Sequence, residues 1–128
     1  MRPSRQLTQK LQKELNSGVI ALVVLATLER SGKAMYGYQI CKHLRDLSHG
    51  DLPMHQGAVY PVLRSLESLH LLTSAIGTSS EGPPRKYYSI TSNGRRTLEK
   101  WVSAWHRTSK FVDAAVEGHS WQKRRKSI

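Results

Sequence analysis

Two strand-like runs, residues 71–78 and 85–91, lie on either side of the turn-forming segment 79–84 (Ser-Ser-Glu-Gly-Pro-Pro), and this arrangement restricts the fold most. Glycine, proline and serine between two runs that contain β-branched and aromatic side chains favour a chain reversal. The segment therefore predicts a β-hairpin with a fairly long tip. Because the rest of the chain shows helical spacing, we expect a mainly α protein with one small β-hairpin.

Apolar side chains at three- and four-residue spacing predict the helices. Leu7, Leu11 and Leu15 form a narrow stripe on a short leading helix. Asn16 or Ser17 is expected to be an N-cap, so that a separate, buried helix follows it. The expected helices cover residues 6–15, 19–28, 36–47, 56–70 and 92–117. After the short leading helix, three helices and a hairpin describe a winged helix-turn-helix, in which the third helix enters the DNA major groove.

The charge of the chain favours a polyanionic partner. Its net charge is +11 and its isoelectric point is near 10.2. Much of this excess lies in the two ends, because residues 1–13 and 123–126 are basic without any acid. Since a basic end is often only a solvated segment, charge alone favours nucleic acid only slightly.

The remaining composition excludes several classes of protein. Cys41 is the only cysteine, so no disulfide forms within the chain, and a cytoplasmic location is expected. The longest apolar run, residues 19–28, is too short to span a membrane, and the polar N-terminus predicts no leader. The residues show no catalytic arrangement and no metal-ligand spacing. We therefore expect neither an enzyme nor a cofactor or metal site.

Three motifs carry a resemblance to a known family. They are residues 35–40 (Met-Tyr-Gly-Tyr-Gln-Ile), residues 57–67 (Gly-Ala-Val-Tyr-Pro-Val-Leu-Arg-Ser-Leu-Glu) and residues 82–91 (Gly-Pro-Pro-Arg-Lys-Tyr-Tyr-Ser-Ile-Thr), followed by Gly94. In this order and spacing, the sequence closely resembles PadR-type transcriptional regulators from about residue 15 to 117. It is most similar to the small subclass, which has a single short C-terminal helix.

The resemblance implies a homodimer joined through the first and last helices. It also implies repression of a nearby gene, relieved by a small molecule or another signal. The expected domains are a basic arm with a short helix (1–15), the winged helix-turn-helix (16–91), the dimerisation helix (92–118) and a basic, disordered tail (119–128). Two residues depart from the family pattern: His55 replaces a frequent serine, and Ala58 replaces the usual threonine. Both lost hydroxyls lie near the start of the recognition helix, where backbone amides remain as phosphate donors.

The DNA-contacting residues are expected on the third helix, the second helix and the wing. Gln56, Tyr60 and Arg64 share one helix face, and glutamine and arginine are the residue types that pair with adenine and guanine. The alternative for this face is plain solvation. Phosphate contacts are expected to outnumber base contacts. The full candidate set is Tyr38, Lys42, Gln56, Gly57, Tyr60, Arg64, Arg85 and Lys86.

The dimer contacts are expected at Leu22, Leu98, Trp101, Trp105 and Val112. Trp101 and Trp105 lie four residues apart, so they meet on one side of the last helix. A plain apolar interface is the first interpretation of this pair. In some relatives a tryptophan at the position of Trp105 lines a cavity that accepts flat aromatic compounds, so a planar effector is the second interpretation. Two other functions stay open: sequence-blind binding through the basic ends, and a winged helix that binds small molecules or proteins but little DNA.

Overall fold

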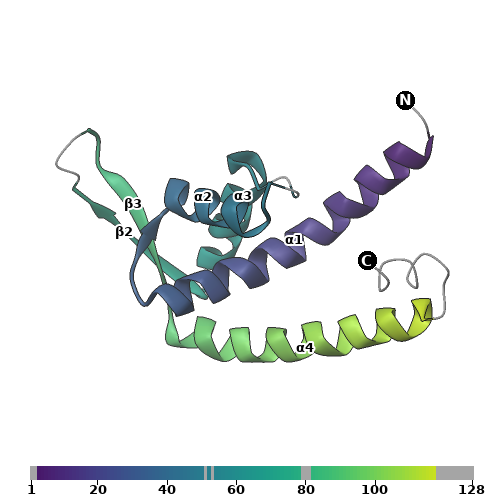
Figure 1. The fold of residues 1–128 in the computed structure, drawn as a ribbon. Helices are drawn as coiled ribbons and strands as arrows, with labels where there is room; N and C mark the ends of the chain where they lie inside the picture. Colours follow the sequence, from purple (N-terminus) through teal and green to yellow (C-terminus); the bar gives the residue numbers. More distant parts are fainter. Residues whose placement is uncertain (1–2, 51, 53, 79–81, 118–128) are drawn as a thin grey trace. The chain divides into compact units, whose positions relative to one another are not determined.

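The computed structural model describes residues 3–50, 52, 54–78 and 82–117. Its helices and strands follow the order α1, β1, α2, α3, β2, β3, α4; Figure 1 labels all of them except β1. Their bounds are α1 Pro3–Ser31, β1 Met35–Tyr36, α2 Gly37–Leu47, α3 Gln56–Ser68, β2 Leu72–Gly77, β3 Arg85–Ile90 and α4 Ser92–Val116. Three helices followed by a hairpin confirm the expected winged helix-turn-helix. The expected disordered tail lies outside the described residues.

The core of the domain forms where the apolar faces of α1, α2 and α3 meet the sheet. Apolar residues at helical spacing supply these faces, and burial of such side chains drives the packing. The buried residues are Ile20, Val24, Leu25 and Leu28 of α1, Ile40, Cys41 and Leu44 of α2, Val59, Leu63 and Leu66 of α3, and Leu71, Leu72, Tyr88 and Ile90 around the sheet. This packing holds α3 in place, so that one face of the helix stays free.

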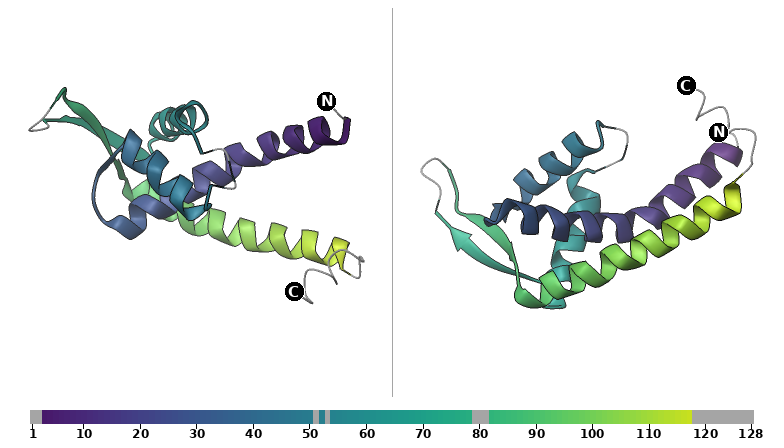
Figure 2. Two further views of the ribbon diagram at one scale, coloured as in Figure 1. Left: turned by 45° about the horizontal axis from the view of Figure 1, so that its top comes forward. Right: turned by 60° about the horizontal axis from the view of Figure 1, so that its bottom comes forward.

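The first helix differs from the expectation, because α1 runs unbroken from Pro3 to Ser31. The predicted separation into two helices at Asn16 and Ser17 was wrong. Asn16 does not cap a new helix: its side chain is buried, and its Oδ1 accepts a hydrogen bond from Gln12 Nε2 at 2.7 Å, one turn earlier. Both views of Figure 2 show the first turns of α1 continuing past α2 and α3.

The sheet has three strands rather than the two predicted, in the order β1-β3-β2 with antiparallel pairing. The additional strand, β1, pairs Met35 with Tyr88 and Tyr36 with Tyr87. Two residues are too few to show an alternating pattern, so this strand could not be recognised from the sequence. Its consequence is that the residues just before α2 are joined directly to the wing.

Thr91 links the end of the hairpin to the start of α4. Its Oγ1 accepts a hydrogen bond from Gly94 N at 2.9 Å, as an N-cap does, and donates to His70 O at 2.8 Å. A β-carbon at Gly94 would collide with the backbone of Leu71, so only glycine fits this close approach. In addition, Arg95 Nε lies 3.0 Å from Glu29 Oε2 of α1. The first turns of α4 are thus fixed to the domain.

The chain divides into two compact units, Met1–Leu98 and Glu99–Ile128. Within the second unit, α4 carries Trp105, Phe111 and Val112, whose side chains are 49%, 75% and 50% exposed. In the first unit, Leu7, Leu11 and Leu15 of α1 are 67%, 57% and 50% exposed. By length and composition, one stretch of α1, Arg5–Ser31, is long and apolar enough to cross a membrane. Its most apolar part, however, forms the core of the domain.

Candidate nucleic-acid interface

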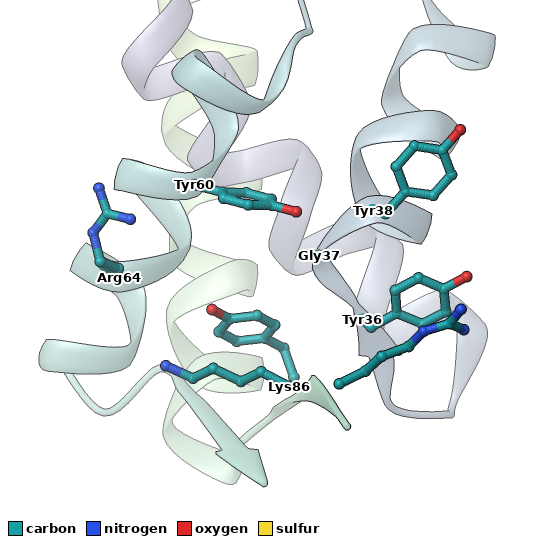
Figure 3. A pocket seen from close by; sticks show the side chains of 8 residues that line it. Tyr36, Gly37, Tyr38, Tyr60, Arg64 and Lys86 are labelled. Carbon is teal, nitrogen blue, oxygen red and sulfur yellow. The ribbon is translucent and has the colours of Figure 1, made fainter. Parts of the chain in front are cut away.

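A concavity of about 670 Å³ lies between the start of α2, the middle of α3 and the base of the wing (Figure 3). The eight residues that line it are Tyr36, Gly37, Tyr38, Tyr60, Arg64, Arg85, Lys86 and Tyr88. Five of them belong to the set predicted from the sequence: Tyr38, Tyr60, Arg64, Arg85 and Lys86. The fold therefore gathers predicted residues that are up to 48 positions apart, from Tyr38 to Lys86, around one hollow.

Tyr60 occupies the centre of this concavity. Its ring points from α3 toward Gly37 at the start of α2 (Figure 3). A β-carbon at position 37 would come within 2.8 Å of Tyr60 Cε1, so the absence of a side chain there makes room for the ring. Burial raises the pKa of the Tyr60 phenol above its ordinary value, and nearby Cys41 and Tyr88 act in the same direction. The shift moves the phenol pKa further from neutral pH, where a tyrosine hydroxyl is protonated in any case and can donate a hydrogen bond.

Arg64 lies one turn after Tyr60 on α3 and is exposed. Among the described residues, no acidic side chain forms an ion pair with it. Gln56 is also exposed, but it lies in the first turn of α3, outside the concavity. The outward face of α3 thus presents an amide, a phenol and an unpaired guanidinium in sequence.

At the base of the wing, Arg85 and Lys86 are held in different ways. The Arg85 guanidinium lies 4.3 Å from the centre of the Tyr36 ring, which favours a cation–π interaction. Tyr36 in turn meets Tyr87 edge to face, with ring centres 5.6 Å apart. This stack keeps the Arg85 charge on the surface of the concavity without neutralising it.

Lys86, by contrast, is paired with an acid. Its Nζ lies 3.1 Å from Glu67 Oε1 of α3, and Ser74 Oγ of β2 donates a hydrogen bond to the other carboxylate oxygen. These bonds hold the pKa of Glu67 below its usual value, and the carboxylate raises the pKa of Lys86. The network ties both strands of the wing to the recognition helix. Because Glu67 partly neutralises its charge, Lys86 attracts a phosphate less strongly than Arg85 does.

Besides Gln56, two more predicted DNA residues lie apart from the concavity. Lys42 is exposed on α2 and pairs with Asp46, with Nζ 3.6 Å from Oδ2. Gly57 lines a different hollow, between α3 and α1. Conversely, the sequence set missed Tyr36, Gly37 and Tyr88, which line the concavity. The motif over residues 35–40 contains the first two, but only the pairing of β1 with β3 brings them to the wing.

The residues predicted for dimer contacts show mixed exposure. Leu22 of α1 is half-buried, as are Leu98 and Trp101 of α4. Trp105 and Val112 are about half exposed. The structure thus leaves Trp105 and Val112 outside the core, and their role as dimer contacts stays a prediction.

The concavity combines hydroxyl donors with Arg64 and Arg85, two cations that no described acidic residue pairs with, while its one adjoining carboxylate, Glu67, is bonded to Lys86 and Ser74. Such a surface suits the phosphates and base edges of a nucleic acid. With the three-helix core and the adjoining hairpin, these features define a winged helix-turn-helix DNA-binding protein.

Comparison with known proteins agrees with this class. The model of the PadR-like family of transcriptional regulators matches residues 24–100, and the chain belongs to this family. An uncharacterised protein from Lysinibacillus sphaericus is 30% identical over 86 residues, which cover 67% of this chain and 79% of the relative. The crystal structure of a PadR family transcriptional regulator from Eggerthella lenta is 32% identical, with a TM-score of 0.75, over 91% of this chain and 97% of that one.

A PadR-like transcriptional regulator from Bacillus cereus is also similar, at 28% identity and a TM-score of 0.67. The alignment covers 83% of this chain and 99% of that one. The chain is therefore a PadR-like transcriptional regulator, and its family is one of DNA-binding regulators rather than of enzymes.

Proposed function

We propose that this regulator is a cytoplasmic homodimeric repressor that binds a palindromic operator and is released from it by a small molecule. Each recognition helix, α3, reads one half of the operator, while the wing and α2 contact the flanking phosphates. The DNA-binding domain corresponds to residues 16–91, and α4 supplies the dimer contacts.

One observation carries the DNA-binding part of this proposal. Tyr38, Tyr60, Arg64 and Arg85 come from three separate elements and line a single concavity. Of these four, Tyr38 has a cation–π contact within its own helix, with the Arg45 guanidinium 5.9 Å from its ring centre. Donors and cations gathered at one surface in this way match the contacts that position a DNA backbone.

Two further features support the dimer and the effector. The exposed stripe of Leu7, Leu11 and Leu15 on α1 recurs every four residues, and α4 exposes Trp105 and Val112. A protein in water normally covers contiguous apolar surface of this kind. A planar aromatic effector stacks on Trp105, with Trp101 beside it, in a gap of the apolar seam between two copies.

Selection of bound sites from random DNA tests the proposed function. The expected result is an inverted repeat whose half-sites lie about one helical turn apart, since a two-fold dimer presents two recognition helices. Tyr60→Ala and Arg64→Ala are expected to abolish retardation of the selected DNA while sedimentation still shows the dimer. Lys110→Ala, which removes an exposed cation of α4, serves as the matched control and retains binding. A pool with no enriched sequence, or normal retardation by both α3 variants, contradicts the proposal.

A further inference from the structure

A second hollow of about 740 Å³ lies between the N-terminal half of α1 and the start of α3. Its floor is apolar and includes Ile20, Ala58, Pro61 and Val62. Its remaining lining residues are Gln9, Gln12, Lys13, Asn16, Ser17, His55 and Gly57. The volume lies within the range of sites that bind drug-sized molecules. We call this hollow the α1–α3 groove.

The groove lies on the opposite side of α1 from the exposed leucine stripe. Each helical residue turns by about 100°, so Leu11 and Ile20, nine positions apart, point about 180° apart. A second copy that covers Leu7, Leu11 and Leu15 therefore leaves the groove open. The same geometry directs Ala58 and Val62 away from the DNA face of α3, because each points about 160° from Tyr60, whereas Gly57, which has no side chain, lies nearer that face.

The polar side chains around the groove offer hydrogen-bond donors and a positive charge. Lys13 is exposed and forms no ion pair with any described residue. Asn16 is only 8% exposed; its Oδ1 is bonded to Gln12, and its Nδ2 has no hydrogen-bond partner among the described residues. A buried amide donor that lacks a partner costs free energy until an acceptor reaches it. None of the described lining residues carries a carboxylate.

His55 completes this lining from the α3 side. It is the N-cap residue of α3, yet its side chain makes no capping hydrogen bond. Its ring instead lies against Gly57, where a β-carbon would come within 3.1 Å of His55 Nδ1. The small residues Gly57 and Ala58 thus keep the groove open, and the imidazole remains available to a molecule within it.

From these observations we infer that the α1–α3 groove binds a small molecule with an apolar body and one acidic group. The body fills the floor formed by Ile20, Ala58 and Val62. The acidic group accepts from Asn16 Nδ2 and lies beside Lys13. This site is separate from the proposed stacking position at Trp105, and it touches the recognition helix directly on the side that faces away from DNA.

The test uses the full chain and two fluorescent probes with the same body. The first, 8-anilinonaphthalene-1-sulfonate, carries an acidic group, whereas N-phenyl-1-naphthylamine lacks it. Titration followed by probe fluorescence is expected to show at least about tenfold tighter binding of the sulfonate, because only the sulfonate can satisfy Asn16 and Lys13. Equal affinity for the two probes contradicts the inference.

Variants then locate the probe. Val62→Phe fills the groove from α3 and Ser17→Phe fills it from α1; each is expected to weaken sulfonate binding at least about tenfold. Ile76→Phe adds the same ring to an exposed position of β2 and is the matched control, and Trp105→Phe removes the alternative platform. Both are expected to change the affinity less than about twofold. Far-UV circular dichroism shows whether each variant is folded, and either filling variant alone suffices for the test.

Two outcomes overturn the inference. One is unchanged sulfonate binding in the folded filling variants; a simultaneous loss in Trp105→Phe would place the probe at α4. The other is a change of oligomeric state in the filling variants without a change in probe affinity, which shows that a second copy covers the groove. Because neither measurement involves DNA, failure here leaves operator binding untouched and is distinguished from failure of the proposed function.

Discussion

Gly37 and Tyr60 are in direct contact: the ring of Tyr60 rests where a side chain at position 37 would be, with its Cε1 only 2.8 Å from the place of a β-carbon. This contact joins the start of α2 to the middle of α3. It sets the position of the phenol that we propose to meet DNA. Substitution of the glycine therefore changes the DNA-binding surface without altering any of the residues that touch DNA.

Gly37→Ala is expected to weaken operator binding about tenfold, because the added methyl group displaces the Tyr60 ring, and a loss of about 1.4 kcal/mol corresponds to that factor. Fluorescence anisotropy with operator DNA measures this change. The decisive control is a double-mutant cycle with Tyr60→Ala, in which the free energy of unfolding in urea is measured because Tyr60→Ala is expected not to bind the operator. If the glycine acts through the ring, Gly37→Ala has no further effect once the ring is removed; an equal loss in both backgrounds contradicts this explanation.

The salt dependence of DNA binding is expected to distinguish the two cations of the wing. The logarithm of the DNA-binding constant falls linearly with the logarithm of the salt concentration, and each phosphate contact makes this slope steeper by about 0.9. Arg85→Gln removes from each half of a dimer a charge that no described acidic residue neutralises, so the slope should become shallower by about two. Lys86→Gln should change it less, because Glu67 already balances that ammonium. Equal changes in the two variants would show that the ion pair opens on DNA.

The Glu67 network predicts a specific pH dependence of stability. Because the folded state lowers the pKa of Glu67 below its usual value of 4.5, its contribution is complete above that pH and is lost as the pH falls through the lower, folded pKa. Urea unfolding of the wild type should therefore show stability that declines below about pH 4.5. Glu67→Gln should flatten this part of the curve. Glu14→Gln, at an exposed position of α1, should keep the wild-type shape; a parallel decline in Glu67→Gln would remove the network as its cause.

The leucine stripe predicts the effect of a polar substitution on assembly. Leu11→Gln replaces the central side chain of the stripe, which is 57% exposed, and should shift the equilibrium from dimer toward monomer. Analytical ultracentrifugation over a range of concentrations measures this shift. Lys10→Gln alters the neighbouring position and should leave the dimer unchanged. A Leu11→Gln protein that dimerises as tightly as the wild type would place the interface elsewhere.

Much of the fold followed from local patterns in the sequence. The apolar spacing of α2 and α3 and the turn residues before β3 were sufficient, because these elements follow their own propensities. The break expected at Asn16 was wrong for a tertiary reason: the residue is buried and bonded to Gln12 within a continuous helix. Strand β1 was missed because two residues form a strand only when Tyr87 and Tyr88 are beside them.

The sequence predicted which residues lie at the candidate site but not which of them contact one another. The motif around Tyr60 and the basic pair at the wing identified four of the residues in the concavity, and Tyr38 followed from the motif at residues 35–40. The sequence could not show that Glu67 neutralises Lys86, since the two are 19 positions apart and meet only through the folded sheet. The roles of these residues in DNA binding stay predictions.

A single residue, Thr91, separates the last wing strand from α4, and its hydroxyl bonds both to the turn after α3 and to the first turn of α4. No longer linker separates β3 from α4 at this junction. Any displacement of the first turn of α4 is therefore coupled to the end of β3 and to the turn that follows α3.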